Sequence, residues 1–195
     1  MAEKKIDPSL RLISEYLKID SDSKFVIPEY QRAYSWSNDV QCDKLWEDIT
    51  TFIQDERKEP YFFGTVIVDA SVEGELSLID GQQRTTTFIL LMKALLMQIE
   101  KTLSSMPSDS ESKDLKELLE DDQNKIIEIL YKVDPEGRQE ISKDWLKAKN
   151  KLLLESRSIN EEDSYKNDLQ AILEAKTYKE AEENVHTIQG RRKDR

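Results

Sequence analysis

A cluster of polar side chains stands where an apolar strand pattern ends and a long apolar helix pattern begins. The segment reads Leu78-Ile79-Asp80-Gly81-Gln82-Gln83-Arg84-Thr85-Thr86-Thr87. The first free amides of a helix and its macrodipole favour an anion at such a place, and Gly81 leaves room for close approach. One carboxylate, two amides, one guanidinium and three hydroxyls gather here, which is more polar chemistry than a strand-to-helix connection needs. The layout therefore indicates a phosphate-binding site.

The charged side chains of this segment have distinct candidate roles. Arg84 is expected to meet the phosphates, because its planar fork can bond two oxygens at once. The alternative is a structural arginine at the strand end. Asp80 could hold a Mg²⁺ ion or orient an attacking water, and the alternative is a simple Asx turn with Gly81.

Amides and hydroxyls complete the predicted site. Gln82 and Gln83 cannot act as bases, but an amide can hold a water in line or donate to a developing oxyanion. One of the two could instead bond to neighbouring backbone. Thr85, Thr86 and Thr87 lie in the expected first helical turn, where hydroxyls either reach phosphate or magnesium or serve as ordinary caps.

Hydrophobic spacing predicts the elements that position this segment. Asp7-Pro8, followed by apolar residues at helical spacing, predicts a helix that begins at an aspartate N-cap. A strand at 24–27 is stopped by Pro28, and a helix from Ser37 to about Arg57 is expected to turn its Trp46 side inward. Strands at 61–69 and 75–80 predict a hairpin. A nearly all-apolar helix at about 83–103 should be the buried centre.

The rest of the chain predicts a helical extension. Residues 1–103 form the expected domain that carries the phosphate-binding site, and the Ser, Asp and Pro content of 104–112 predicts a linker. Residues 113–185 are expected to be helical, with helices near 115–130, 145–154 and 165–175 and a turn at Asp134-Pro135-Glu136-Gly137. Residues 186–195 are expected to be a flexible tail.

Composition restricts the function classes. The 195 residues carry a net charge of −11, which argues against bulk attraction to nucleic acid, so any DNA contact must use a local patch. One cysteine and one histidine exclude an intramolecular disulfide and a Cys/His metal cluster. The sequence predicts neither an export signal nor a membrane span, and an intracellular location is the natural expectation.

Three segments together resemble a known family. They are Ile27-Pro28-Glu29-Tyr30-Gln31-Arg32-Ala33-Tyr34-Ser35-Trp36, Tyr61-Phe62-Phe63-Gly64-Thr65-Val66-Ile67-Val68 and Ile79-Asp80-Gly81-Gln82-Gln83-Arg84-Thr85-Thr86-Thr87. In order and spacing they resemble the N-terminal domain of GmrSD-type, modification-dependent restriction proteins. The resemblance covers about residues 8–103 well and the remainder loosely. It implies an α+β, ParB/sulfiredoxin-like fold, in which a small sheet is packed with helices.

The resemblance also implies an activity and partners. In that family the domain is taken to bind and hydrolyse nucleoside triphosphate and to help sense modified phage DNA, while a separate HNH nuclease domain cuts. An HNH site needs two histidines, so this chain is not expected to be a nuclease on its own. Mg²⁺ is the expected cofactor, and an HNH nuclease domain or subunit is an expected partner. The resemblance also implies a cytoplasmic location, which the single cysteine fits.

In a ParB-like fold the first strand lies near the glycine turn, which would bring a second polar segment to the same cleft. Tyr30, Gln31 and Arg32 are then expected to contact nucleotide or a DNA backbone, with Arg32 among the phosphate ligands. Tyr30, Tyr34 or Trp36 could stack on a base. The alternative for Tyr34 and Trp36 is an anchoring role in the core.

Three hypotheses remain in order of preference. The first is a nucleotide-hydrolysing sensor domain of a phage-defence system. The second is a ParB-like module that binds nucleotide or DNA as a switch without chemistry. The third is a scaffold whose acidic helices dock a partner, and it ranks last because polar groups concentrate at residues 80–87.

Overall fold

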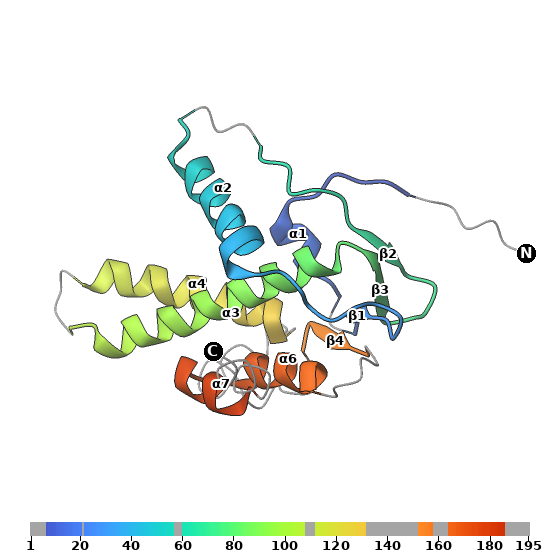
Figure 1. Cartoon of the computed structure of the whole chain (residues 1–195). Coiled ribbons are helices and arrows are strands. Elements are labelled where there is room, and N and C mark those ends of the chain that lie inside the picture. The colour runs from blue at the N-terminus through green and yellow to red at the C-terminus, as the bar shows by residue number, and fades with distance from the viewer. Residues whose placement is uncertain are drawn as a thin grey trace, which may run out of the picture.

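The protein folds as an α+β structure in which helices pack around a small mixed sheet (Figure 1). The computed structural model describes residues 7–20, 22–56, 60–107, 112–131, 152–157 and 164–185. The predicted turn at 134–137, most of the predicted helix at 145–154 and the tail at 186–195 lie outside the described residues. The α+β prediction is confirmed.

The four described strands form one sheet in the order β2-β3-β1-β4. Their bounds are Lys24–Ile27 for β1, Ile67–Asp69 for β2, Glu75–Asp80 for β3 and Leu154–Ser156 for β4. β1 is parallel to both β3 and β4, whereas β2 is antiparallel to β3. The predicted hairpin is confirmed, but its first strand begins at residue 67 rather than 61. Gly64, with φ +99°, interrupts the extended backbone there.

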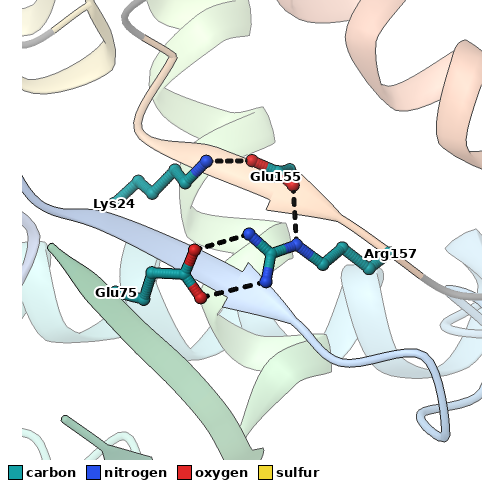
Figure 2. A network of polar contacts seen from close by, with 4 residues as sticks. All are labelled: Lys24, Glu75, Glu155 and Arg157. Atoms are coloured by element: carbon teal, nitrogen blue, oxygen red, sulfur yellow. Dashed lines mark hydrogen bonds and ion pairs between the residues drawn. The ribbon is translucent and has the colours of Figure 1, made fainter. Parts of the chain in front are cut away.

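Strand β4 comes from the part of the chain expected to be a helical extension. A charged network holds it to the sheet, as Figure 2 shows: Arg157 donates to both carboxylate oxygens of Glu75, at 2.9 and 2.6 Å, and to Glu155 at 2.8 Å. Lys24 on β1 pairs with the same Glu155. The division of the chain at 104–112 stays a prediction, although elements from both sides of it share the sheet.

The buried centre of the molecule is α3, Gln82–Ser105, which confirms the predicted central helix. α4, Lys113–Tyr131, lies beside it in Figure 1 and was also predicted. Helix α6, Ser164–Glu174, matches the prediction at 165–175, and a short α7, Tyr178–Asn184, was not foreseen. The shared core draws on both halves of the chain; its members include Phe25, Leu78, Ile89, Leu96, Ile127, Leu130, Leu154 and Leu173.

The first helix begins later than predicted. α1 spans Ile13–Leu17, and Leu17 is buried as expected, but no helix begins at Asp7. The Glu15 carboxylate accepts the Leu12 amide at 3.0 Å, so the side chain that caps the helix lies inside its first turn. Leu10 finds no apolar partner surface and is 90% exposed.

The prediction that Trp46 faces inward is wrong. A π-helical turn, Asn38–Cys42, leads into α2, Asp43–Gln54, and Trp46 is 55% exposed. The helix instead turns Leu45 toward the core. Figure 1 shows the C-terminal end of α2 pointing away from the other helices. Among the described helices, none is long and apolar enough to cross a membrane.

A lysine is buried where three helices meet. Lys93 of α3 is 1% exposed and donates from Nζ to the Tyr131 hydroxyl of α4 at 2.7 Å. Tyr131 in turn donates to the Leu173 carbonyl of α6 at 2.6 Å. Burial lowers the pKa of Lys93 from 10.5 to about 7, against the opposing effect of Glu100 and Glu180.

Lys93 should make stability rise with pH. Between pH 7 and 9 the unfolded chain keeps a proton on this amine that the folded chain has released, so the free energy of unfolding increases with pH. In urea denaturation we expect the free energy of unfolding of the parent to rise with pH more steeply than that of a Lys93→Met variant. The difference in slope should be up to about 1.4 kcal/mol per pH unit. Lys101→Met, at an exposed position of the same helix, is the control. Equal slopes for the parent and Lys93→Met would contradict this prediction.

Candidate functional site

The turn between β3 and α3 requires glycine. Gly81 has φ +84°, a left-handed conformation that L side chains rarely adopt. A Cβ at this position would also lie 2.8 Å from Cγ2 of Val66. The segment around Val66 therefore lies directly against the turn, and both the conformation and the space exclude a larger residue.

Gln82 and Gln83 are buried and bond to the loop that follows β1. Gln82 donates to the Arg32 carbonyl at 3.2 Å. Gln83 donates to the Ala33 carbonyl at 3.2 Å and accepts the Ser35 amide at 2.8 Å. The two amides thus hold three positions of the loop backbone against the first turn of α3.

The same loop is fastened by its own side chains. Gln31 donates from its amide nitrogen to the Ile79 carbonyl at 2.8 Å. The hydroxyls of Tyr34 and Thr87 are hydrogen bonded at 2.8 Å. The structure therefore brings the two predicted polar segments together. The Tyr34 side chain points to α3, where its hydroxyl contacts Thr87.

The threonine side chains face the interior. Thr85, Thr86 and Thr87 are 0%, 1% and 9% exposed. Thr85 donates to the Gly81 carbonyl at 3.1 Å, so the Tyr16 hydroxyl, 2.9 Å from Thr85 Oγ1, must be the donor of that second bond. Burial raises the pKa of Tyr16 to about 12, which keeps this donor protonated. Thr87 likewise donates to the backbone four residues back, the Gln83 carbonyl, at 2.8 Å.

Asp80 and Arg84 are the charged side chains of the segment that solvent reaches. Their side chains are 64% and 32% exposed, and Arg84 Nη2 lies 3.6 Å from Asp80 Oδ2. Nη2 also donates to the Thr65 carbonyl, and the guanidinium lies over Gly64, where a Cβ would come within 3.3 Å of it. The buried Nε of Arg84 has no hydrogen-bond partner among the described residues.

Tyr30 and Arg32 lie on the exposed part of the fastened loop. Tyr30 is 71% exposed, and the Arg32 side chain is exposed while its carbonyl is held by Gln82. Because the loop is anchored on either side of them, both side chains are presented from a fixed backbone beside α3. They are available for a ligand or a nucleic-acid backbone.

Sequence reasoning missed a cavity beside Arg84. It has a volume of about 230 Å³ and lies between α2, residues 61–63 and the start of α3. Five of its lining residues are aromatic: Trp36, Tyr61, Phe62, Phe63 and Phe88. The Tyr61-Phe62-Phe63 triplet was the available signal, but it was assigned to a strand. Outside a strand, its side chains can face α2 and α3.

A metal would find a single carboxylate at this turn. Within the described ranges, no group of three or more His, Cys, Asp or Glu side chains could hold a metal ion. Mg²⁺, however, usually keeps several waters and takes one or two carboxylates plus substrate phosphates. The exposed Asp80 carboxylate fits that second arrangement.

Fold and site together define an α+β domain with an exposed Asp–Arg pair at a helix N-terminus, beside a loop locked in place by glutamine. The chain matches the family described as GmrSD restriction endonuclease, N-terminal domain, over residues 13–191, and it belongs to that family. The match extends through the helical part that the sequence resemblance covered loosely. No match to a curated protein was found. Family membership supports a role in restriction, a defence against phage.

Removing the Gln83 amide should loosen the loop. Gln83→Met keeps the length of the side chain but cannot bond Ala33 or Ser35, so we expect a loss of roughly 1–2 kcal/mol in the free energy of unfolding. Hydrogen exchange at the Ser35 amide should become faster. Gln98→Met, at an exposed position of the same helix, is the matched control. Unchanged exchange at Ser35 would mean that the hydrogen bonds of Gln83 do not order the loop.

Proposed function

We propose that this chain is a nucleoside-triphosphate-binding and hydrolysing sensor domain of a restriction protein, with its site at the β3–α3 turn. The observation that carries the proposal is the sorting of the polar segment. The glutamine and threonine side chains are buried inside the protein, whereas Asp80 and Arg84 reach solvent together at the start of α3. The part of the Arg84 guanidinium that solvent reaches, beside the exposed carboxylate of Asp80, suits a phosphate ligand.

Each residue then has a role that its position supports. Arg84 bonds phosphate oxygens, and Gly81 permits the left-handed turn that brings Asp80 and Arg84 to the start of α3. Asp80 orients an attacking water or holds Mg²⁺, which would neutralise phosphate charge when bound. Gln82 and Gln83 keep the neighbouring loop in place, so that Arg32 and Tyr30 border the same site.

DNA and a nuclease are the partners that the family suggests. A net charge of −11 leaves local cations such as Arg32 to contact a DNA backbone. The single histidine of the sequence is too few for an HNH centre. We therefore assign DNA cleavage to a nuclease domain or subunit outside these residues, and the detection of modified DNA to the assembly of the two.

One observation favours a second candidate, a nucleotide-binding switch without chemistry. Both Gln82 and Gln83 already use their amides on the Arg32, Ala33 and Ser35 backbone. Gln83, whose oxygen and nitrogen are both engaged with the loop backbone, is then not free to hold a water in line. As a switch, the domain would bind nucleotide tightly and signal through the loop after β1, whose backbone Gln82 and Gln83 hold.

Phosphate release separates the two candidates. The purified chain is incubated with each of the four ribonucleoside triphosphates and Mg²⁺, with and without DNA. We expect release that falls about 10²-fold in Arg84→Ala and in Asp80→Ala, because one electrostatic contact to a transition state contributes about that much. Arg11→Ala, at an exposed position on the N-terminal segment, is the control.

The other outcomes are also decisive. Tight nucleotide binding without release would favour the switch. Release unaffected in both Arg84→Ala and Asp80→Ala would show that the site assignment is wrong. A folded chain that binds no nucleotide would contradict both candidates and favour a scaffold.

A further inference from the structure

The aromatic residues that line the cavity beside Arg84 come from three separate parts of the chain. Trp36 comes from the end of the clamped loop, Tyr61 to Phe63 from the segment before β2, and Phe88 from the second turn of α3. The rings contact one another edge to face: Tyr61 and Phe63 have centroids 4.6 Å apart, and Phe63 and Phe88 5.1 Å apart. These contacts fix the inner wall of the cavity.

Phe62 is the most exposed ring of this aromatic group. It lines the cavity but is 69% exposed, while its neighbour Phe63 packs against the core. A large ring left in water at the mouth of a cavity gains when a flat apolar group covers it. The cavity therefore offers an unsatisfied stacking surface.

Two cations are among the residues that line the cavity. Arg84 lines the cavity and is also the cation of the β3–α3 turn, and Lys44 of α2 lines it as well. The acidic lining residue, Asp48, accepts the Tyr61 hydroxyl at 2.6 Å. A ligand that fits would combine a planar aromatic part with an anionic part that ends near Arg84.

We propose that the cavity binds the nucleobase of the nucleoside triphosphate whose phosphates contact Arg84. This inference rests on the proposed function and adds the location of the base. Cavities that enclose whole drug-sized ligands measure roughly 300–1,000 Å³, so about 230 Å³ suits the base and leaves the triphosphate outside at the turn. Because stacking accepts the face of any base, we also expect little discrimination among the four nucleotides.

The test compares nucleotide with inorganic triphosphate. Binding of a non-hydrolysable β,γ-imido nucleoside triphosphate and of inorganic triphosphate is measured by calorimetry with Mg²⁺. We expect Phe62→Ala to weaken nucleotide binding roughly tenfold, in line with the loss of one stacking contact, and to leave inorganic triphosphate unaffected. Arg84→Ala should weaken both. Phe52→Ala, on α2 but away from the cavity lining, is the matched control and should change neither.

Each remaining result has a definite meaning. If Phe62→Ala binds the nucleotide like the parent, the base lies elsewhere and the inference is overturned while the proposed function stands. If Phe62→Ala weakens inorganic triphosphate equally, the ring supports the phosphate site and the inference is again overturned. If the folded parent binds neither ligand, the proposed function fails and this inference fails with it.

Discussion

The structure around the site depends on one requirement, that the buried side-chain amides of Gln82 and Gln83 find hydrogen-bond partners. An unmatched buried amide costs about as much as a lost hydrogen bond, and the backbone of residues 32–35 supplies the partners. The loop after β1 is thereby tied to the start of α3. Its exposed residues, and Trp36 at its end, occupy their places as a consequence of that tie.

The polar segment at 80–87 divides its residues between the interior and the surface. The hydroxyls of Thr85 and Thr87 hydrogen bond to backbone carbonyls and to tyrosines from distant segments. The side chains of Asp80 and Arg84, in contrast, are exposed to solvent. The sequence was enough to locate the segment, but not to predict which of its side chains are buried and which are exposed. That prediction depends on which face of α3 is covered by Tyr16 and Tyr34, and both tyrosines lie outside the segment.

Elements with a local signal were predictable, and elements defined by distant contacts were not. The apolar run of α3 and the β2–β3 hairpin carry their own periodicity, so both were found. Strand β4 has three residues and exists because Phe25 on β1 pairs with Leu154. The predicted orientation of α2 was wrong for a related reason. Its amphipathic pattern indicates which face is apolar but does not show that another part of the chain covers that face.

The position of β1 in the sheet has a consequence for biosynthesis. β1 lies between β3 and β4, both parallel to it and both later in the chain. A ribosome therefore delivers the central strand before either neighbour, and parallel pairing over such sequence distances is slow to form. Until Leu154–Ser156 emerges, one side of β1 presents unpaired backbone groups that can recruit other nascent chains. Closure of the sheet, marked by Arg157 reaching Glu75, is thus a late event in the making of this protein.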